Sequence, residues 1–406
     1  MERLAGLTQQ LTSSITPVQV CLLAGSNGSH YNIAVIGNNP RFRVQILTRR
    51  PEIFASKSVT GIYDADKSTI KGNLHLATAD PKEACKGTKV FIVSSPVSAQ
   101  EEILRSIKPY VEQGSIIGSV YGQGGFDLIA ENVFGEDIKK KNLAIFALFN
   151  IPSTCKVITP GKEVVIIGPK KYLSVAVIPK SRATEVQHLC TEMWRVPTTI
   201  CPNFLNMMLT PGNQIIHTGR LLGLYDNNKA HALDRIPFFY TELNQLSADN
   251  MDKLSDEIQL VKKELNRRYP DIDLDLVLPL KDRIIAQYGD QVKDKSNMYT
   301  VFTTNTGYRV MTIPMVENKD KKFELNTKAR TFVEDIPFGL VVIKDIAELL
   351  GVEVPFTTQC IEWHQKMMGK EFVQGGKLNR ALLKETGAPS RYGYDSIEKL
   401  VQHYRQ

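Results

Sequence analysis

Three charged residues, Arg330, Glu334 and Asp335, stand directly before a long apolar run near the end of the chain. Asp335, followed two residues later by Pro337, predicts a helix start, because Asp can cap free backbone N–H groups and Pro is tolerated in the first turn. The helix behind it, to about Leu350, is apolar on most sides and is predicted to be buried. An arginine and two carboxylates at the mouth of such a helix can hold a charged group at a fixed point. The alternative is an interdomain salt bridge at a helix cap.

A histidine in a second apolar segment could supply proton-transfer chemistry. His217 lies in the helical segment 213–224, soon after Pro211-Gly212. A histidine in an apolar helix is more often a satisfied core residue, but imidazole is also the side chain that titrates near neutral pH. Pairing with a carboxylate such as Asp335 would orient the ring and stabilise its cationic form. The other six histidines suit this role less well, because they fall in predicted turns, a polar strand or surface segments.

A turn of small residues follows the first predicted strand. Val18–Leu23 has the length of a buried parallel strand and runs into the sequence AGSNGSH, and a second strand is predicted at Phe42–Leu47. Strand, small-residue turn, short helix and strand is the opening of a dinucleotide-binding unit, where the backbone approaches a pyrophosphate at a helix N-terminus. The residues predicted to contact a cofactor are Ala24, Gly25, Ser26, Asn27, Gly28 and Ser29.

The glycine pattern of this turn is incomplete, and the next strand end is unusual. The GxGxxG spacing would fall on Ala24, Ser26 and Ser29, none of which is glycine. The second strand ends in Thr48-Arg49-Arg50, without the acid that usually accepts from the NAD ribose. NAD(H) is the favoured cofactor, with contacts from Thr48 and Arg49. NADP(H) is the alternative, because Arg49 and Arg50 could pair with a 2′-phosphate. Both arginines could also be solvated turn residues.

The alternation of strands and helices continues through the first half of the chain. Strands are predicted over 89–94, 115–120 and 144–148, and helices over 99–111 and 183–194. Short apolar runs within 157–178 could extend the sheet. This pattern is typical of a doubly wound α/β sheet, in which ligands bind outside the carboxyl ends of the strands. The residues that follow strand ends, and that are therefore predicted to line the ligand crevice, are Ser95, Pro96, Gln123 and Asn150.

The second half has a different pattern, in which helical segments dominate from about Pro202. Helices are predicted over 204–224, 250–268, 275–288, 335–350, 357–368 and 395–406. The predicted fold is α/β followed by all-α. A polar N-terminal arm occupies 1–16, a Rossmann-type NAD(P)-binding domain 17–200, and a mainly helical substrate-binding and catalytic domain 201–406. The cleft between two such domains is the default ligand site.

Composition excludes several other classes of protein. The 406 residues are 42% hydrophobic and 23% charged, with no apolar run near the ~20 residues of a membrane helix. Residues 1–16 lack the pattern of a secretory signal. The six cysteines form no CxxC pair, which predicts free thiols and no metal site. The net charge of +7 is spread along the chain, which argues against a nucleic-acid partner. These features predict a cytoplasmic protein without a membrane partner.

Several motifs together resemble the opine dehydrogenase family, and their order along the chain makes the resemblance specific. They are GSNGSH at 25–30, GQGGFD at 122–127, IIH at 215–217, TTNTGY at 303–308, RTFVEDIPFGLVV at 330–342 and RYGYDSIEKL at 391–400. The resemblance covers nearly the whole chain beyond the N-terminal arm. It implies an enzyme that condenses the amino group of an amino acid with a 2-oxo acid, usually pyruvate, and reduces the imine with NAD(P)H.

The resemblance also implies roles for individual residues. The family's catalytic histidine and its aspartate partner match His217 and Asp335, and its arginine for the oxo-acid carboxylate matches Arg330. Gln123 matches a glutamine at the substrate crevice. The full set of predicted substrate-binding residues is Arg330, Gln123, Phe149, Asn150, Thr154 and Cys155. Ala24 and Ser26 depart from the family's glycines, which puts the geometry of the pyrophosphate turn in doubt.

The identity of the amine donor is a separate inference from the sequence. The segment 146–155 contains no acid, whereas a guanidinium donor would need a carboxylate in its pocket. A small uncharged or anionic donor is therefore favoured, such as taurine, β-alanine, alanine or glycine, although Glu242 or Asp335 could also reach the pocket. The alternatives are a simple hydroxy-acid or ketone dehydrogenase of the same fold and a non-catalytic nucleotide-sensing protein. The resemblance favours a monomer.

Overall fold

The computed structural model describes residues 16–225, 229–309 and 311–405. All of the predicted N-terminal arm except Thr16 lies outside these residues. The described chain forms two compact units. The first contains 16–95, 99–121 and 133–200, and the second contains 96–98, 122–132 and 201–405. Each unit is described separately.

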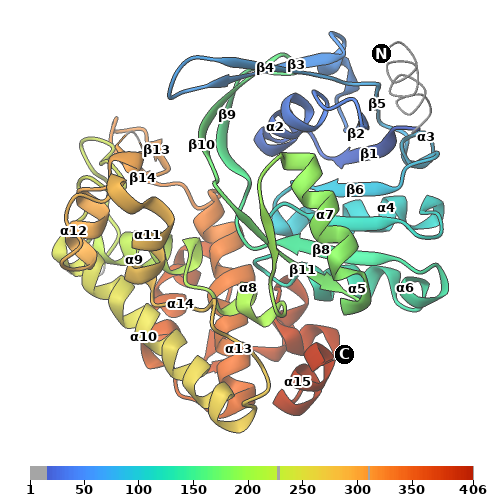
Figure 1. Ribbon diagram of the computed structural model, residues 1–406. Coiled ribbons are helices and arrows are strands. Elements are labelled where there is room, and N and C mark those ends of the chain that lie inside the picture. Colours follow the sequence, from blue (N-terminus) through green and yellow to red (C-terminus); the bar gives the residue numbers. More distant parts are fainter. Residues whose placement is uncertain (1–15, 226–228, 310, 406) are drawn as a thin grey trace, which may run out of the picture. The chain divides into compact units, whose positions relative to one another are not determined.

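The first unit is built on an eight-stranded sheet (Figure 1). Its strands, in chain order, are β1 (Val18–Leu23), β2 (Phe42–Leu47), β5 (Leu76–Thr78), β6 (Val90–Val93), β7 (Ile116–Ser119), β8 (Ala144–Leu148), β11 (Leu173–Ile178) and β12 (Thr198–Ile200). The helices along the same part of the chain are α2 (Asn27–Ile36), α3 (Pro81–Cys85), α4 (Val97–Ile107), α6 (Asp137–Lys140) and α7 (Ala183–Trp194). Helix α5 (Phe126–Phe134) also falls in this stretch, but most of it groups with the second unit.

The strand order confirms the predicted doubly wound fold. Six parallel strands run in the order β5-β2-β1-β6-β7-β8, with the first strand in the middle, and β11 joins β8 in the antiparallel sense. This is the arrangement of a Rossmann fold, whose switch point lies between β1 and β6. Strands β1, β6 and β8 are apolar runs that are buried along most of their length, as is usual for parallel strands with both faces covered.

A second, four-stranded sheet packs against α2 in the first unit. It contains β3 (Ser58–Tyr63), β4 (Thr69–Asn73), β9 (Ser153–Thr159) and β10 (Glu163–Pro169), in the order β4-β3-β10-β9. The prediction that 157–178 extends the main sheet is therefore right only for β11. The earlier part of that segment belongs to the second sheet, because α2 buries one side of these strands in a shared apolar core.

The second unit is mainly helical, as predicted (Figure 1). Its helices are α8 (Leu205–Leu209), α9 (Asn213–Gly223), α10 (Gln245–Arg268), α11 (Leu280–Tyr288), α12 (Met298–Thr303), the π-helix η6 (Thr331–Leu340), α13 (Val341–Leu350), α14 (Pro355–Met368) and α15 (Ile397–Arg405). Two short ribbons pair β13 (Met315–Glu317) with β14 (Phe323–Leu325), and β15 (Val373–Gln374) with β16 (Lys377–Leu378). The helix predicted over 204–224 is two helices, because Pro211-Gly212 interrupts it.

Short 3₁₀ turns complete the described elements. They are η1 (Pro51–Phe54), η2 (Lys108–Tyr110), η3 (Lys180–Arg182), η4 (Gly289–Gln291), η5 (Thr306–Tyr308), η7 (Arg380–Glu385) and η8 (Pro389–Tyr392).

The helix predicted to start at Asp335 begins earlier, so that prediction is wrong. Arg330 is the N-cap residue, and the π-helix η6 places both Asp335 and Pro337 inside it. The Val341 N–H bonds the carbonyl of Ile336, five residues back, and η6 continues directly into α13. Asp335 does not cap a helix, and its carboxylate instead faces another helix. The wider π turn also holds Pro337, which a regular α-helix accommodates only with a kink.

Glycines set how closely α9 packs against its two neighbours. A Cβ atom added to Gly339 of η6 would lie 2.3 Å from the Cβ of Gln214 on α9. A Cβ added to Gly223 would lie 2.5 Å from the backbone of Ser247 on α10. Helix α9 therefore sits against η6 on one side and α10 on another at distances that larger residues would not permit.

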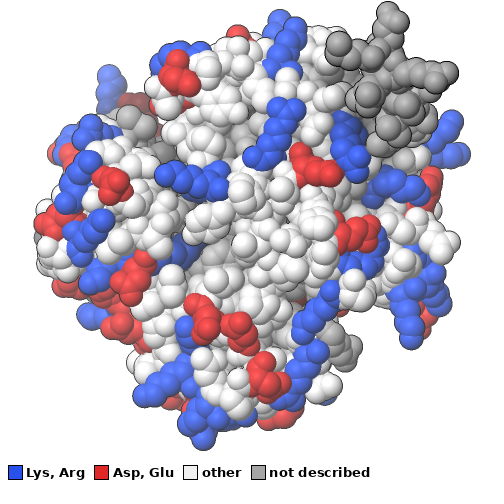
Figure 2. All heavy atoms as spheres, in the orientation of Figure 1, with Lys and Arg blue, Asp and Glu red and all other residues white. Residues whose placement is uncertain are grey.

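None of the described helices combines the length and the hydropathy that a membrane span requires. Figure 2 shows Lys and Arg side chains interspersed with acidic and uncharged residues on the face in view.

Substituting Gly223 by Ala should destabilise the second unit. The new methyl group would meet the Ser247 backbone, and overpacking of this kind costs about 1–3 kcal/mol. Gly219→Ala on the same helix is the matched control. Its nearest neighbours would be 3.1 Å away, and Ala restores about 1 kcal/mol of helix propensity. Urea or thermal unfolding should therefore show a clear loss for Gly223→Ala only. Equal losses for both variants would contradict the packing argument.

Candidate active site

A histidine and a carboxylate meet where α9 packs on the π-helix η6. The Nδ1 atom of His217 lies 2.7 Å from Oδ2 of Asp335, and the two side chains are 20% and 7% exposed. The ring of Phe239 packs edge-on against the imidazole, with the ring centroids 5.1 Å apart. The imidazole is therefore fixed at one nitrogen and along its edge, yet it is accessible.

This pairing determines which ring nitrogen can do chemistry. A carboxylate accepts, so Nδ1 of His217 carries the hydrogen of the 2.7 Å bond. Proton exchange with a ligand would then use Nε2. The arrangement is that of a general acid–base histidine oriented by a carboxylate.

Arg330 stands at the start of the same π-helix. Its Nε atom donates to Oε2 of Glu334 at 2.7 Å. Arg330 is 63% exposed, whereas the Glu334 side chain is 4% exposed. At the start of the π-helix, the exposed Arg330 is therefore hydrogen-bonded to the buried carboxylate of Glu334, and Asp335 follows Glu334 in the sequence.

The turn that contains Gln123 packs on the π-helix through glycines. Gly124 has a φ of +91°, and a Cβ atom there would lie 3.2 Å from both the Cβ and the carbonyl oxygen of Phe338. Gly387 closes the other side, since its N–H donates to the carbonyl of Pro337 at 3.1 Å. The turn that contains Gln123 therefore packs on the π-helix that carries Asp335, within the second unit.

A buried hydrogen bond between two distant segments lies behind the Gln123 turn. The Tyr404 hydroxyl on α15 donates to Oδ2 of Asp127 at 2.6 Å, and both residues are buried. Burial is the largest influence on Asp127 and raises its pKa to about 7. Close by, Nε2 of His403 lies 3.1 Å from Glu131. These contacts join the C-terminal helix to the segment that follows the turn.

In the first unit, three serine hydroxyls meet in the predicted cofactor turn. The Ser26 side chain caps α2 by accepting from the Ser29 N–H at 3.1 Å. The Ser94 hydroxyl, at the end of β6, lies 3.2 Å from that of Ser26 and 2.7 Å from that of Ser29. Ser29 also donates to the carbonyl of Ala24. The hydroxyl groups of Ser26 and Ser29 thus occupy positions where the GxGxxG pattern would place glycines without side chains.

Ala24 shows why a glycine is usual at its position. Its φ is +81°, in the left-handed region, where an L side chain is strained by roughly 1 kcal/mol or more. The strain is held by the hydrogen bond from Ser29 and by the bond from the Ala24 N–H to the carbonyl of Leu47. The turn therefore keeps its backbone conformation, although a methyl group and two hydroxyl groups replace the hydrogen atoms that glycines would have there.

His30 fixes the other end of this turn. Its Nε2 accepts from the Gly161 N–H at 2.8 Å, so Nδ1 carries the hydrogen and donates to the Ser26 carbonyl at 2.7 Å. Burial lowers the pKa of His30, which favours this neutral form. The histidine of the GSNGSH motif therefore ties the turn to the second sheet.

Further small and hydroxyl-bearing residues lie beside the turn. A Cβ atom at Gly28 would lie 3.2 Å from Ser94, so glycine lets the start of α2 pack closely against the residue that follows β6. The Ser95 hydroxyl is buried and has no hydrogen-bond partner among the described residues. Thr48 accepts from the Arg50 N–H at 3.3 Å, and both Arg49 and Arg50 are exposed at the strand end. Pro96 follows in the segment that groups with the second unit.

The four predicted substrate residues of 149–155 lie in the first unit but in two different sheets. Phe149 and Asn150 follow β8 of the main sheet and are half-buried, whereas Thr154 and Cys155 belong to β9. Thr154 is exposed. Cys155 packs against the apolar core, and burial raises its pKa to about 11. Residues 149–155 therefore do not form one continuous surface, because they extend from one sheet to the other.

Three contributors to these sites had not been singled out from the sequence. Ser94 immediately precedes the predicted Ser95, so its position after a strand was the available signal. Phe239 contacts His217, and its carbonyl accepts from the buried Arg220 at 2.9 Å. Arg220 lies one turn after His217 on α9. The residues that it bonds are distant in sequence, so the sequence around Arg220 did not indicate its contact with Phe239.

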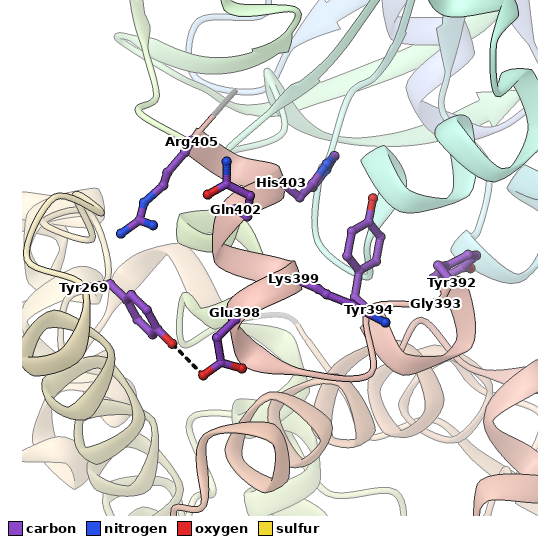
Figure 3. Close-up of a pocket in the computed structure, with 9 residues that line it drawn as sticks. All are labelled: Tyr269, Tyr392, Gly393, Tyr394, Glu398, Lys399, Gln402, His403 and Arg405. Carbon is purple, nitrogen blue, oxygen red and sulfur yellow. Dashed lines mark hydrogen bonds between the residues drawn. The ribbon is translucent and has the colours of Figure 1, made fainter.

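A surface pocket of about 870 Å³ lies along α15 and contains none of the predicted site residues (Figure 3). It includes part of the RYGYDSIEKL motif. Its cations are already paired, Arg405 with Asp271 and Lys399 with Asp395, and the Tyr269 hydroxyl donates to Glu398 at 3.0 Å. In the part of the chain that the structure describes, no group of three or more His, Cys, Asp or Glu side chains could hold a metal ion.

The chain resembles known proteins in sequence and in fold. Residues 200–368 match the family described as NAD/NADP octopine/nopaline dehydrogenase, alpha-helical domain. The tauropine dehydrogenase of Arabella iricolor is 28% identical, covering 95% of this chain and all of that protein. An opine dehydrogenase of Haliotis discus hannai is also 28% identical, covering 96% and 99% of the two chains.

Solved structures show the same fold. Octopine dehydrogenase in complexes with NADH and either L-arginine or pyruvate aligns with TM-scores of 0.85 and 0.81. Each alignment covers 95% of this chain and 98% of the other at 24% identity, so it supports the fold alone. Together these findings define an oxidoreductase of the nicotinamide-dinucleotide-dependent dehydrogenases. The chain is similar over nearly its whole length to members of the opine dehydrogenase family.

Replacing Asp127 by Asn should remove a pH dependence of stability. The pKa of Asp127 is raised to about 7 from 3.8, so the folded state holds a proton that the unfolded state releases. Stability from this group is complete below about pH 4, is lost as the pH rises through 7, and stays low above that. Asp127→Asn should therefore match the wild type at pH 4 and exceed it at pH 8 by up to about 4 kcal/mol.

Chemical unfolding at both pH values measures this difference. Asp320→Asn, at an exposed turn, is the control and should follow the wild type at each pH. An Asp127→Asn variant with the same pH dependence as the wild type would show that folding does not raise the pKa of Asp127.

Proposed function

We propose that this protein joins the amino group of a small amino acid or taurine to pyruvate and reduces the resulting imine with NAD(P)H to give an opine. The proposal depends on the 2.7 Å bond between His217 and Asp335, on the π-helix that begins at Arg330. A tauropine dehydrogenase is among the relatives, and solved octopine dehydrogenase complexes contain NADH with pyruvate or L-arginine.

Arg330 is the proposed binding group for the oxo-acid carboxylate. A guanidinium can hold a carboxylate through two parallel N–H···O bonds, which orient the substrate as well as attract it. Gln123, Phe149, Asn150, Thr154 and Cys155 remain the proposed neighbours of the two substrates. Among them, Gln123 has the strongest support, because its turn packs directly on η6.

His217 is the proposed acid–base group. As the neutral amine attacks the carbonyl carbon, Nε2 of a protonated His217 can give its proton to the carbonyl oxygen, which later leaves as water. The Asp335 carboxylate keeps the hydrogen on Nδ1 and stabilises the cationic ring. A bound NAD(P)H supplies the hydride that reduces the imine carbon.

The dinucleotide is proposed to bind at the turn after β1. Ala24, Gly25, Ser26, Asn27, Gly28 and Ser29 would surround the pyrophosphate at the N-terminus of α2, with Ser95 and Pro96 at the neighbouring strand end. NAD(H) is the favoured form. The exposed Arg49 and Arg50, beside Thr48, keep NADP(H) as the alternative.

The charges of the second unit support a donor without a cationic side chain. Both oxygens of Glu242 bind Arg235, at 2.8 and 2.9 Å, and one also accepts from the Phe238 N–H at 2.7 Å. Glu334 is engaged with Arg330, and Asp335 with His217. Each of these three acids is thus already paired with an arginine or a histidine. Taurine, β-alanine, alanine and glycine are therefore favoured over arginine.

Two alternatives use the same fold without this chemistry. A simple hydroxy-acid or ketone dehydrogenase would need no amine, and amine-dependent oxidation of NADH separates it from the proposal. A nucleotide-sensing protein would have no use for an oriented histidine beside an arginine, so the joint presence of His217, Asp335 and Arg330 argues against it.

Replacing His217 by Gln should reduce turnover far more than cofactor binding. Loss of a positioned acid–base group costs about 10²–10⁴-fold in rate, and kcat should fall within that range. NADH binding, measured by fluorescence titration, should change less than twofold. His188→Gln, at an exposed position on α7, is the control and should behave as the wild type. Normal turnover of His217→Gln would refute the assignment.

NADH oxidation with pyruvate and a panel of amines tests the proposed donor class. Because Glu242, Glu334 and Asp335 are already paired, taurine or a small amino acid should give at least about tenfold higher kcat/KM than arginine, since an unpaired guanidinium is costly to bury. NADPH is compared in the same assay. Arginine as the best donor would overturn the charge argument and keep the reaction class. The absence of oxidation with every amine would reject the proposed reaction.

A further inference from the structure

We propose that Glu334 is a positioning residue that holds the Arg330 guanidinium in the orientation needed to bind the oxo-acid carboxylate. The inference rests on the proposed function of Arg330 and adds a residue to it. A bidentate contact requires the guanidinium plane to be fixed relative to the substrate. Arg330 is 63% exposed, and an exposed arginine has many rotamers of similar energy unless a neighbour selects one.

The contact with Glu334 differs from an ordinary surface ion pair. Exposed pairs four residues apart on helices are weak because both side chains remain solvated and mobile. The Glu334 side chain is only 4% exposed, so the surrounding residues hold its carboxylate in place. Its Oε2 accepts from Nε of Arg330 at 2.7 Å. A rigid acceptor at Nε fixes the plane of the guanidinium group.

The second oxygen of Glu334 points to a function rather than to stability. Oε1 is buried and has no hydrogen-bond partner among the described residues. A buried carboxylate with one unsatisfied oxygen lowers stability, so a purely structural role would be served better by an apolar side chain. Keeping a carboxylate here is explained if its charge is needed to orient Arg330.

The π-helix provides the geometry for this arrangement. In an α-helix, the residues three and four positions ahead flank a given residue one turn further on. In a π-helix, the residues four and five positions ahead do so, because its hydrogen bonds span five residues. For Arg330 these are Glu334 and Asp335. The π turn thus allows one carboxylate to hold the arginine while its neighbour, on the same side of the helix, binds His217.

Steady-state kinetics of Glu334→Gln and Glu334→Met test the proposal. Gln keeps the shape and loses the charge, and Met removes the acceptor. We expect the KM for pyruvate to rise about tenfold in Glu334→Gln and further in Glu334→Met. The values of kcat and the KM for NADH should change less than threefold. Glu101→Gln is the matched control, because Glu101 pairs with Arg105 at the same spacing on α4 and should have no effect.

A second measurement does not depend on turnover. The Nε–H signal of Arg330, assigned by its loss in Arg330→Lys, should exchange with solvent at least tenfold faster in Glu334→Met than in the wild type. Inactivity of the wild type with pyruvate would reject the proposed function, while this exchange rate would still decide whether Glu334 holds Arg330. An active wild type with an unchanged pyruvate KM in both variants, or with a loss in kcat alone, would overturn the role of Glu334.

Discussion

The hydrogen bond between His217 and Asp335 requires two helices to approach more closely than ordinary side chains permit. Gly339 of η6 has no side chain at the point where η6 contacts Gln214 of α9. Gly223 plays the same part where α9 contacts α10. The position of the imidazole is therefore set by the packing of a three-helix layer, because α9 cannot move away from η6 without meeting α10. Small residues far from any ligand are in this sense part of the site.

The elements predicted best from the sequence are those whose bounds are visible in the hydrophobic pattern of their own residues. Strands β1, β2 and β8 and helix α7 have the bounds that were predicted from their apolar runs. A buried parallel strand has no polar face, so its whole length is visible in the sequence. The sheet to which the strands of segment 157–178 belong was harder to predict, because the unit contains two sheets with similar strands. Which strands join the second sheet depends on packing against α2, which is distant in sequence.

The candidate site was predictable in its residue types and less so in its geometry. The pairing of His217 with Asp335 was anticipated, but the helix start proposed at Asp335 was wrong. Asp followed by Pro carries a strong local signal for a first turn, and nothing local distinguishes a π turn from an α turn. The tight packing at Gly339 is a tertiary effect. The serines of the predicted cofactor turn were likewise visible as residue types, but their contact with Ser94 depends on the strand order.

The π-helix has a consequence for comparing this chain with its relatives. Arginine and aspartate five positions apart on a π-helix lie on the same side, as do two residues four positions apart on an α-helix. A relative that lost one residue between these positions could therefore form a regular α-helix and present the same pair of side chains. An alignment would record a gap and a mismatched motif at that point, although the arrangement of charges had been conserved. The spacing from Arg330 to Asp335 is thus meaningful only together with the type of helix that bears it.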